Sequence, residues 1–333
     1  MITLRRPRLR IINFPKSHIV HVTHAIVKIL LFTDTSTEYF FSFTENAYGI
    51  SIVANQEAIE QDFLPALEAT NCPDLDVANG VFRILQVDEE YGQELGGKRI
   101  SEISEPLAEG QFSILYLSTY QTDFVLVSEP KLYQVMQALL DYGCDSLEEY
   151  GQEESANVPT AEEQMDLEEQ ESESRSPVDP TQFLLDINVL ENDLQCVGLN
   201  RHYRSGWVHT VLKTLCYPQL VHGGSDILDK RFCSFVYTND DVSLIADTHI
   251  LEAFAESSLM RDQDAAGLRV IQVHFSGSNI ERSGIVRHVS QPLAIEANIN
   301  MFYLSTFKTA NIIVSAGDLD RAVGILAPSK AIT

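Results

Sequence analysis

The sequence contains none of the short motifs that mark the common enzyme classes. It has no GxSxG, HExxH, GxGxxG or GxxxxGK[ST] pattern. The usual signatures of serine hydrolases, zinc proteases, dinucleotide-binding enzymes and P-loop NTPases are therefore missing. We expect a protein that is not an enzyme, with no catalytic residues and no cofactor.

Metal-binding patterns are also missing. The five cysteines of the 333 residues are odd in number and scattered, without a CxxC pair, which is typical of reduced thiols in a cytoplasmic protein. His18, His21 and His24 recur every three residues, but on a helix only part of this set would share a face. We therefore expect no metal site.

Basic residues and long apolar runs are scarce. There are 23 lysines and arginines against 48 acidic residues, which gives a net charge of -25. Phosphate backbones and anionic lipids attract the opposite charge. Residues 25–32 form the longest apolar stretch, which Lys28 interrupts and which is too short to span a bilayer. We expect a cytoplasmic protein that binds neither nucleic acid nor membrane.

One segment has very few large apolar residues. Residues 145–180 hold thirteen acids and one base. Such a composition cannot bury enough surface to offset the entropy of ordering the chain. We predict a disordered acidic linker here, with one folded half on each side.

The two halves repeat one another. Leu-Ser-Thr-Tyr at 117–120 corresponds to Leu-Ser-Thr-Phe at 304–307, 187 residues further along. Arg-Ile-Leu-Gln-Val at 83–87 corresponds to Arg-Val-Ile-Gln-Val at 269–273. A repeat of this length indicates a duplication, and a binding site is often found between two similar halves.

Each half shows strands and helices in the order strand–helix–strand–strand–helix–strand, which is the ferredoxin-like pattern. The fold class is therefore α+β. The first strands of the two halves are predicted at 9–14 and 183–190, and helices at 60–69 and 100–108. About 70 residues fit one unit, so we predict four units and a linker: 1–75, 76–144, 145–180 (linker), 181–262 and 263–333.

Two constellations could carry function. Tyr120, Gln121 and Asp123 lie at a turn between two apolar strands, where they form either a polar connection or an exposed protein-contact site. Ser283 and Gly284 precede a predicted helix. They are either an ordinary N-cap or a backbone cradle for a carboxylate.

The segment 117–127, taken with Ser283–Val286, Pro292–Leu293 and Tyr303–Phe307, resembles the CASTOR family of cytosolic arginine sensors. The resemblance implies four ACT domains in two tandem pairs, a homodimer, and a free amino acid bound between the second and fourth units. It also implies a role in TOR kinase signalling, through a GATOR-like complex that the ligand-free protein binds and inhibits.

The resemblance also assigns residues. It places partner contacts at Tyr120, Gln121 and Asp123. The ligand-binding positions that it implies are Ser113, Ile114, Arg282, Gly284, Ile285, Val286, Thr306, Phe307 and Ala310.

This chain departs from the family at two of these positions. The family has acidic residues where Arg282 and Ala310 stand here. Losing a hydrogen bond to a charged group costs about 1.5–3 kcal/mol, or roughly 10- to 150-fold in affinity. Glu281 and Asn311 are one residue away, which on a strand points to the opposite face. Arginine is therefore not the ligand we expect; the free amino acid stays unidentified.

Two functions remain open at this point. The first is a non-catalytic amino-acid sensor in TOR signalling, and the alternative is an ACT-type allosteric regulatory subunit of an amino-acid biosynthetic enzyme. In either case Tyr120 and Gln121 are expected on the surface, where substitutions cost within about 0.5 kcal/mol.

Overall fold

The computed structural model describes residues 1–33, 37–88, 96–144, 184–222, 230–261 and 266–327. The predicted acidic linker, residues 145–180, lies outside the described residues. The strands are β1 (Ile2–Phe14), β2 (Phe40–Asn46), β3 (Gly49–Asn55), β4 (Asp76–Val77), β5 (Phe82–Val87), β6 (Ile114–Ser118), β7 (Asp123–Ser128), β8 (Leu184–Leu199), β9 (Cys233–Thr238), β10 (Val242–Asp247), β11 (Leu259–Met260), β12 (Leu268–Phe275), β13 (Met301–Ser305) and β14 (Thr309–Ser315). The helices are α1 (Ile19–Phe32), α2 (Gln56–Ala58), α3 (Leu64–Glu68), α4 (Gly96–Glu109), α5 (Leu132–Asp141), α7 (Arg204–Cys216), α8 (Gln219–His222), α9 (Thr248–Leu251), α10 (Ile285–Gln291) and α11 (Leu319–Leu326).

Each half builds an antiparallel sheet around one long strand. In the first half the strand order is β2-β3-β1-β5-β7-β6, and in the second half it is β9-β10-β8-β12-β14-β13. The C-terminal part of β1 pairs with β3 and its N-terminal part with β5. Strand β8 pairs with β10 and β12 in the same manner. A single strand therefore connects two smaller groups of strands in each half.

The two sheets join at both of their edges and form a closed ring. Strand β2 pairs with β9, and β6 pairs with β13. Phe43 lies opposite Phe235, and Leu117 lies opposite Leu304. In both pairs the two residues are equivalents in the sequence repeat, so a pseudo-twofold axis passes through both contacts.

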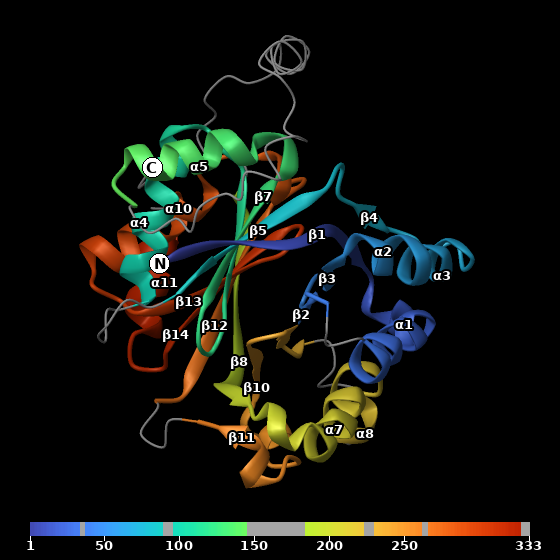
Figure 1. The fold of residues 1–333 in the computed structure, drawn as a ribbon. Helices are drawn as coiled ribbons and strands as arrows, with labels where there is room; N and C mark the ends of the chain where they lie inside the picture. The colour runs from blue at the N-terminus through green and yellow to red at the C-terminus, as the bar shows by residue number, and fades with distance from the viewer. Residues whose placement is uncertain (34–36, 89–95, 145–183, 223–229, 262–265, 328–333) are drawn as a thin grey trace.

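The helices lie outside the ring, in two groups (Figure 1). Helices α4, α5, α10 and α11 pack with one core cluster, and α1, α3 and α7 pack with another. A third cluster collects side chains from the strands of both sheets, which indicates that the inside of the ring is filled. Its members include Leu9, Phe40, Leu117, Phe124, Leu126, Val236, Ile245, Val270, Leu304 and Ile313. Within the described ranges, no helix has the length and apolar character needed to cross a bilayer.

The first strand is longer than predicted. We expected it to begin at Leu9, whereas β1 begins at Ile2. The additional residues are rich in arginine and do not look like a strand. Their charges are paired with distant parts of the chain: Arg5 with Asp240 at 2.7 Å and Arg8 with Glu129 at 2.6 Å.

The boundaries of β8, α4 and the helix predicted at 60–69 also differ from the prediction. Strand β8 continues nine residues beyond the predicted end at 190, through the polar sequence Glu191-Asn192-Asp193, and ends at Leu199. Helix α4 begins at Gly96 and ends at Glu109, around the predicted 100–108. The predicted helix 60–69 is irregular, with a π-helical turn at Ile59–Phe63 between α2 and α3.

The ring closure predicts that the two halves associate without a covalent connection. Residues 1–144 and 181–333, expressed as two separate chains, should co-purify, because each half alone exposes two sheet edges and the central core. Size-exclusion chromatography of the mixture measures this. Val236→Asp, which places a charge in the central cluster, should weaken the association. Two separate peaks for the unmodified halves would contradict the closed ring.

Candidate ligand cavity and partner-facing turn

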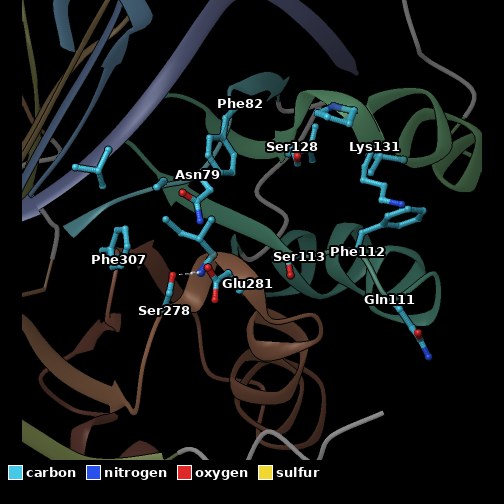
Figure 2. A pocket seen from close by; sticks show the side chains of 16 residues that line it. Asn79, Phe82, Gln111, Phe112, Ser113, Ser128, Lys131, Ser278, Glu281 and Phe307 are labelled. Atoms are coloured by element: carbon cyan, nitrogen blue, oxygen red, sulfur yellow. Dashed lines mark hydrogen bonds between the residues drawn. The ribbon is translucent and has the colours of Figure 1, made fainter. Parts of the chain in front are cut away.

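A cavity of about 520 Å³ lies where the first half meets the C-terminal part of the second half. Figure 2 shows Asn79, Phe82 and Phe307 on one side of it and Phe112 and Lys131 on the other. Its size is within the range of roughly 300–1,000 Å³ that is usual for small-molecule sites.

The lining of the cavity combines apolar walls with a few polar groups. Phe82 and Phe307 form part of the apolar wall. Among the described lining residues there is one cationic side chain, Lys131, and one carboxylate, Glu281; neutral polar groups come from Asn79, Gln111, Ser113, Ser128 and Ser278. The lining therefore carries one side chain of each charge around a partly apolar space.

The turn that carries Phe307 is held rigidly. The Thr306 N–H donates to the Thr309 carbonyl oxygen at 2.8 Å, and the Thr309 N–H donates to Thr306 Oγ1 at 3.1 Å. Asn46 Nδ2 donates to Thr309 Oγ1 at 2.8 Å, and Lys308 pairs with Asp76 at 2.7 Å. The N-terminal part of the first half therefore fixes one wall of the cavity.

The backbone cradle that we predicted lies beside this cavity. Ile114, Arg282, Gly284, Ile285 and Val286 surround an adjoining space that admits no water-sized sphere. Gly284 precedes α10 with φ of 77°, a conformation that favours glycine. Ser113 lines the larger cavity, and Phe112 borders both spaces.

Arg282 and Glu281 are placed differently from the expectation for a strand. Residues Asn279–Glu281 form a 3₁₀ turn, so the rule of alternating faces does not hold. Glu281 lines the cavity, whereas Arg282 lines the adjoining space, near Gly277. Burial lowers the pKa of the Arg282 guanidinium, and the neighbouring Glu281 carboxylate raises it in part.

Two other predicted positions, Thr306 and Ala310, lie deeper, and so does Asn311, the neighbour of Ala310. Thr306 is buried in the turn described above. Ala310 is fully buried in β14, opposite Val273 and Ser305. Asn311 is equally buried, and its Nδ2 donates to the Leu304 carbonyl oxygen at 2.9 Å. Of the predicted ligand residues, Ser113 and Phe307 line the larger cavity, five line the adjoining space, and Thr306 and Ala310 line neither.

The second candidate site is the turn between β6 and β7. Thr119 N–H donates to the Thr122 carbonyl oxygen at 3.0 Å, which leaves Tyr120 and Gln121 at the tip. Gln121 is exposed and Tyr120 is half-buried. A methyl group on Gly198 would lie 2.7 Å from Tyr120 Cδ1, so the ring packs closely on the second half. Replacing Tyr120 should therefore cost more stability than a surface substitution.

Asp123 is an internal residue. Only 2% of it is exposed. Its carboxylate accepts from Arg99 Nε at 2.6 Å and from the Tyr116 hydroxyl at 2.9 Å. Burial raises the pKa of the Asp123 carboxyl, although Arg99 lowers it. Of the three residues predicted to contact a partner, the structure places Gln121 most fully on the surface.

Asp241 was not predicted, and it lies directly behind this turn. The Thr119 hydroxyl donates to Asp241 Oδ2 at 2.6 Å. Burial raises the pKa of the Asp241 carboxyl to about 6, against the lowering effect of the Thr119 hydroxyl and nearby backbone N–H groups. The spacing Thr238-x-x-Asp241, which matches Thr119-x-x-Thr122, was the available sequence signal.

The three histidines do not form a metal centre. His18 and His21 have ring centroids 5.5 Å apart. In the part of the chain that the structure describes, no group of three or more His, Cys, Asp or Glu side chains is arranged to hold a metal ion.

Comparison with known proteins first identifies the class of protein to which the chain belongs. A family model described as the ACT domain matches residues 78–141 and 265–328, one copy in each half. A second model, the N-terminal domain of cytosolic arginine sensor for mTORC1 subunit 1, matches residues 8–66. An aspartate kinase structure from Synechocystis covers 97% of this chain and 54% of its own, at 10% identity and a TM-score of 0.35, too low to support an inference. The chain is an ACT-domain protein.

Comparison with individual relatives identifies the family within this class. The chain is 25% identical over 328 residues to cytosolic arginine sensor for mTORC1 subunit 1 of Bos taurus, covering 96% of this chain and 95% of the relative. It is 32% identical over 123 residues to the putative protein CASTOR3P of Homo sapiens, covering 35% of this chain and 71% of the relative. The chain therefore belongs to the CASTOR family, as a divergent member.

The raised pKa of Asp241 predicts an unusual dependence of stability on pH. Its pKa rises from about 3.9 when unfolded to about 6 when folded. Its ionisation therefore destabilises the fold above pH 6, and this cost disappears as the pH falls below about 4. The stability advantage of Asp241→Asn over the wild type should therefore grow by roughly 2–3 kcal/mol as the pH rises from 4.5 to 7.5. Urea unfolding at several pH values measures the difference; a constant difference would contradict the assignment.

Proposed function

We propose that this chain is a non-catalytic sensor of a free amino acid, built from four ACT units. The units are 1–75, 76–144, 181–262 and 263–333, with 145–180 as the linker. The strand orders β1–β3–β2, β5–β7–β6, β8–β10–β9 and β12–β14–β13, one for each unit, support this division. The N-terminal parts of β1 and β8 would then complete the sheets of the second and fourth units.

The proposed ligand site lies between the second and fourth units. The 520 Å³ cavity carries this proposal, because its lining comes from both units and includes the predicted residues Ser113 and Phe307. The ligand carboxylate would approach the backbone at Ser113, or Lys131, because the space around Gly284 admits no water-sized sphere. Glu281 would pair with the α-amino group.

The charges around this site disfavour arginine. Once Lys131 and Glu281 pair with the two α-groups of a ligand, a cationic side chain lacks a second carboxylate among the described lining residues. The Arg282 guanidinium lies beside the cavity. Two like charges about 4 Å apart repel by roughly 4 kcal/mol at an effective dielectric of 20. A neutral amino acid fits this arrangement better.

The proposed partner is a GATOR-like protein complex, and the proposed pathway is TOR kinase signalling in the cytoplasm. Relatives covering nearly the whole chain are named cytosolic arginine sensors for mTORC1, which supports this role. The turn with Tyr120 and Gln121 is the proposed contact. Its exposed Gln121 offers a hydrogen-bonding side chain to a partner.

We also propose a homodimer. Val20, Phe32 and Leu220 are exposed by 61%, 74% and 68%. They lie on α1 and α8, and α7 packs between these two helices in the outer layer. Large apolar side chains exposed on neighbouring helices support a contact between two copies of the chain.

The ligand preference can be tested by calorimetry. The wild-type protein should bind arginine very weakly and a neutral amino acid more tightly. Arg282→Glu combined with Ala310→Asp should shift the preference toward arginine by at least about tenfold, because each restores a carboxylate. Arg287→Glu, on α10 and paired with Glu105, controls for the charge reversal at Arg282. Tight arginine binding by the wild type would show that the ligand is placed differently.

The partner can be tested by affinity capture, with and without a panel of amino acids. The wild type should recover a GATOR-like complex, and Gln121→Ala should lose most of it while its melting temperature stays nearly unchanged. Gln137→Ala, an exposed glutamine on α5, should behave as the wild type. Recovery of a metabolic enzyme instead would favour a regulatory subunit.

A further inference from the structure

Tyr120 packs onto a surface that the second half provides. Its ring lies against Gly198 in β8, and the Met260 methyl group lies against the same glycine. Its backbone N–H donates to Ser243 Oγ at 3.0 Å. Ser243 and Gly198 are themselves paired across β10 and β8. Gly198, Ser243 and Met260 therefore form one continuous contact surface for Tyr120.

Asp241 extends this contact to the base of the turn. It is 3% exposed, and its Oδ2 accepts from Thr119 Oγ1 at 2.6 Å. The backbone N–H groups of Val242 and Gln121 also lie near this carboxylate, although neither makes a well-aligned hydrogen bond to its other oxygen, Oδ1. Such an arrangement is costly and is uncommon without a specific role. The role visible here is to hold Thr119.

The repeat gives this turn a counterpart. Tyr120 corresponds to Phe307, and both sit at the tip of a turn closed between two threonines. The turn with Phe307 lines the cavity. The turn with Tyr120 is held by the second half, as the turn with Phe307 is held by the first, but it does not line this cavity. The same element is therefore used for two different tasks at two places in the ring.

We propose that the partner-binding surface is a composite of both halves, in which Asp241, Ser243 and Gly198 are positioning residues that hold Thr119 and Tyr120 so that Gln121 faces the partner. This inference rests on the proposed partner role of the turn. Glycine at 198 is required because any larger side chain would push against the Tyr120 ring.

The test uses full-length Asp241→Ala and Gly198→Ala. The first removes the acceptor of Thr119, and the second adds a methyl group 2.7 Å from Tyr120 Cδ1. Asp241→Asn keeps an acceptor oxygen and serves as the rescue variant. Asp240→Ala, an adjacent acid paired with Arg5 on the surface, is the matched control.

Two measurements are made on each variant: binding to a purified GATOR-like complex, and hydrogen exchange of the peptide that contains residues 119–122. Asp241→Ala and Gly198→Ala should weaken binding by about tenfold or more and speed exchange in this peptide. Asp241→Asn should recover most of both, and Asp240→Ala should match the wild type. A loss confined to partner binding and this peptide separates positioning from general unfolding.

The outcomes are distinct. If Gln121→Ala abolishes binding while Asp241→Ala and Gly198→Ala bind as the wild type, the composite surface is wrong and the partner role stands. If the wild type binds no GATOR-like complex, the proposed partner fails. Hydrogen exchange at residues 119–122 then decides whether the second half holds the turn. Unchanged exchange in Asp241→Ala and Gly198→Ala would show that it does not.

Discussion

The pairing of the two sheets at both edges is the interaction on which the rest of this structure depends. Strands β2 and β9 pair over six residues each, and β6 meets β13. At the second contact, Tyr116 N–H donates to Ser305 Oγ and Tyr303 N–H donates to Ser118 Oγ, at 3.0 and 3.1 Å. Equivalent serines therefore bridge the strands symmetrically. The central core, the cavity and the Tyr120 contact all require that both edges are closed.

The same duplication produces two unlike sites. Phe307 and Tyr120 are equivalent positions, yet one lines an open cavity and the other is packed against Gly198. Few substitutions are needed for such a difference, since a glycine or a larger residue decides whether a ring packs or leaves space. A symmetric ancestor could thus acquire separate surfaces for a ligand and a partner without changing its strand order.

The repeat made much of the fold predictable from the sequence, because patterns of apolar residues recur in both halves. The length of β1 and β8 was not predictable, since Arg5, Arg8 and Asp193 look like loop residues and are paired with distant charges. For the site, a local motif indicated Gly284, and the family resemblance indicated Ser113 and Phe307. Lys131 and Asp241 were missed because their roles arise only when the halves meet, and the Thr238-x-x-Asp241 spacing does not reveal that Asp241 contacts Thr119.

The closed ring also has a consequence for synthesis of the protein. The partner of β2 is β9, about 190 residues further along the chain, so the first half leaves the ribosome with both outer strands unpaired. At roughly 5–20 residues per second, the second half follows about 10–40 seconds later. Exposed strand edges invite pairing with other chains during this interval. The rate of translation, and chaperones that shield nascent strands, should therefore influence the yield of native protein more than the final stability does.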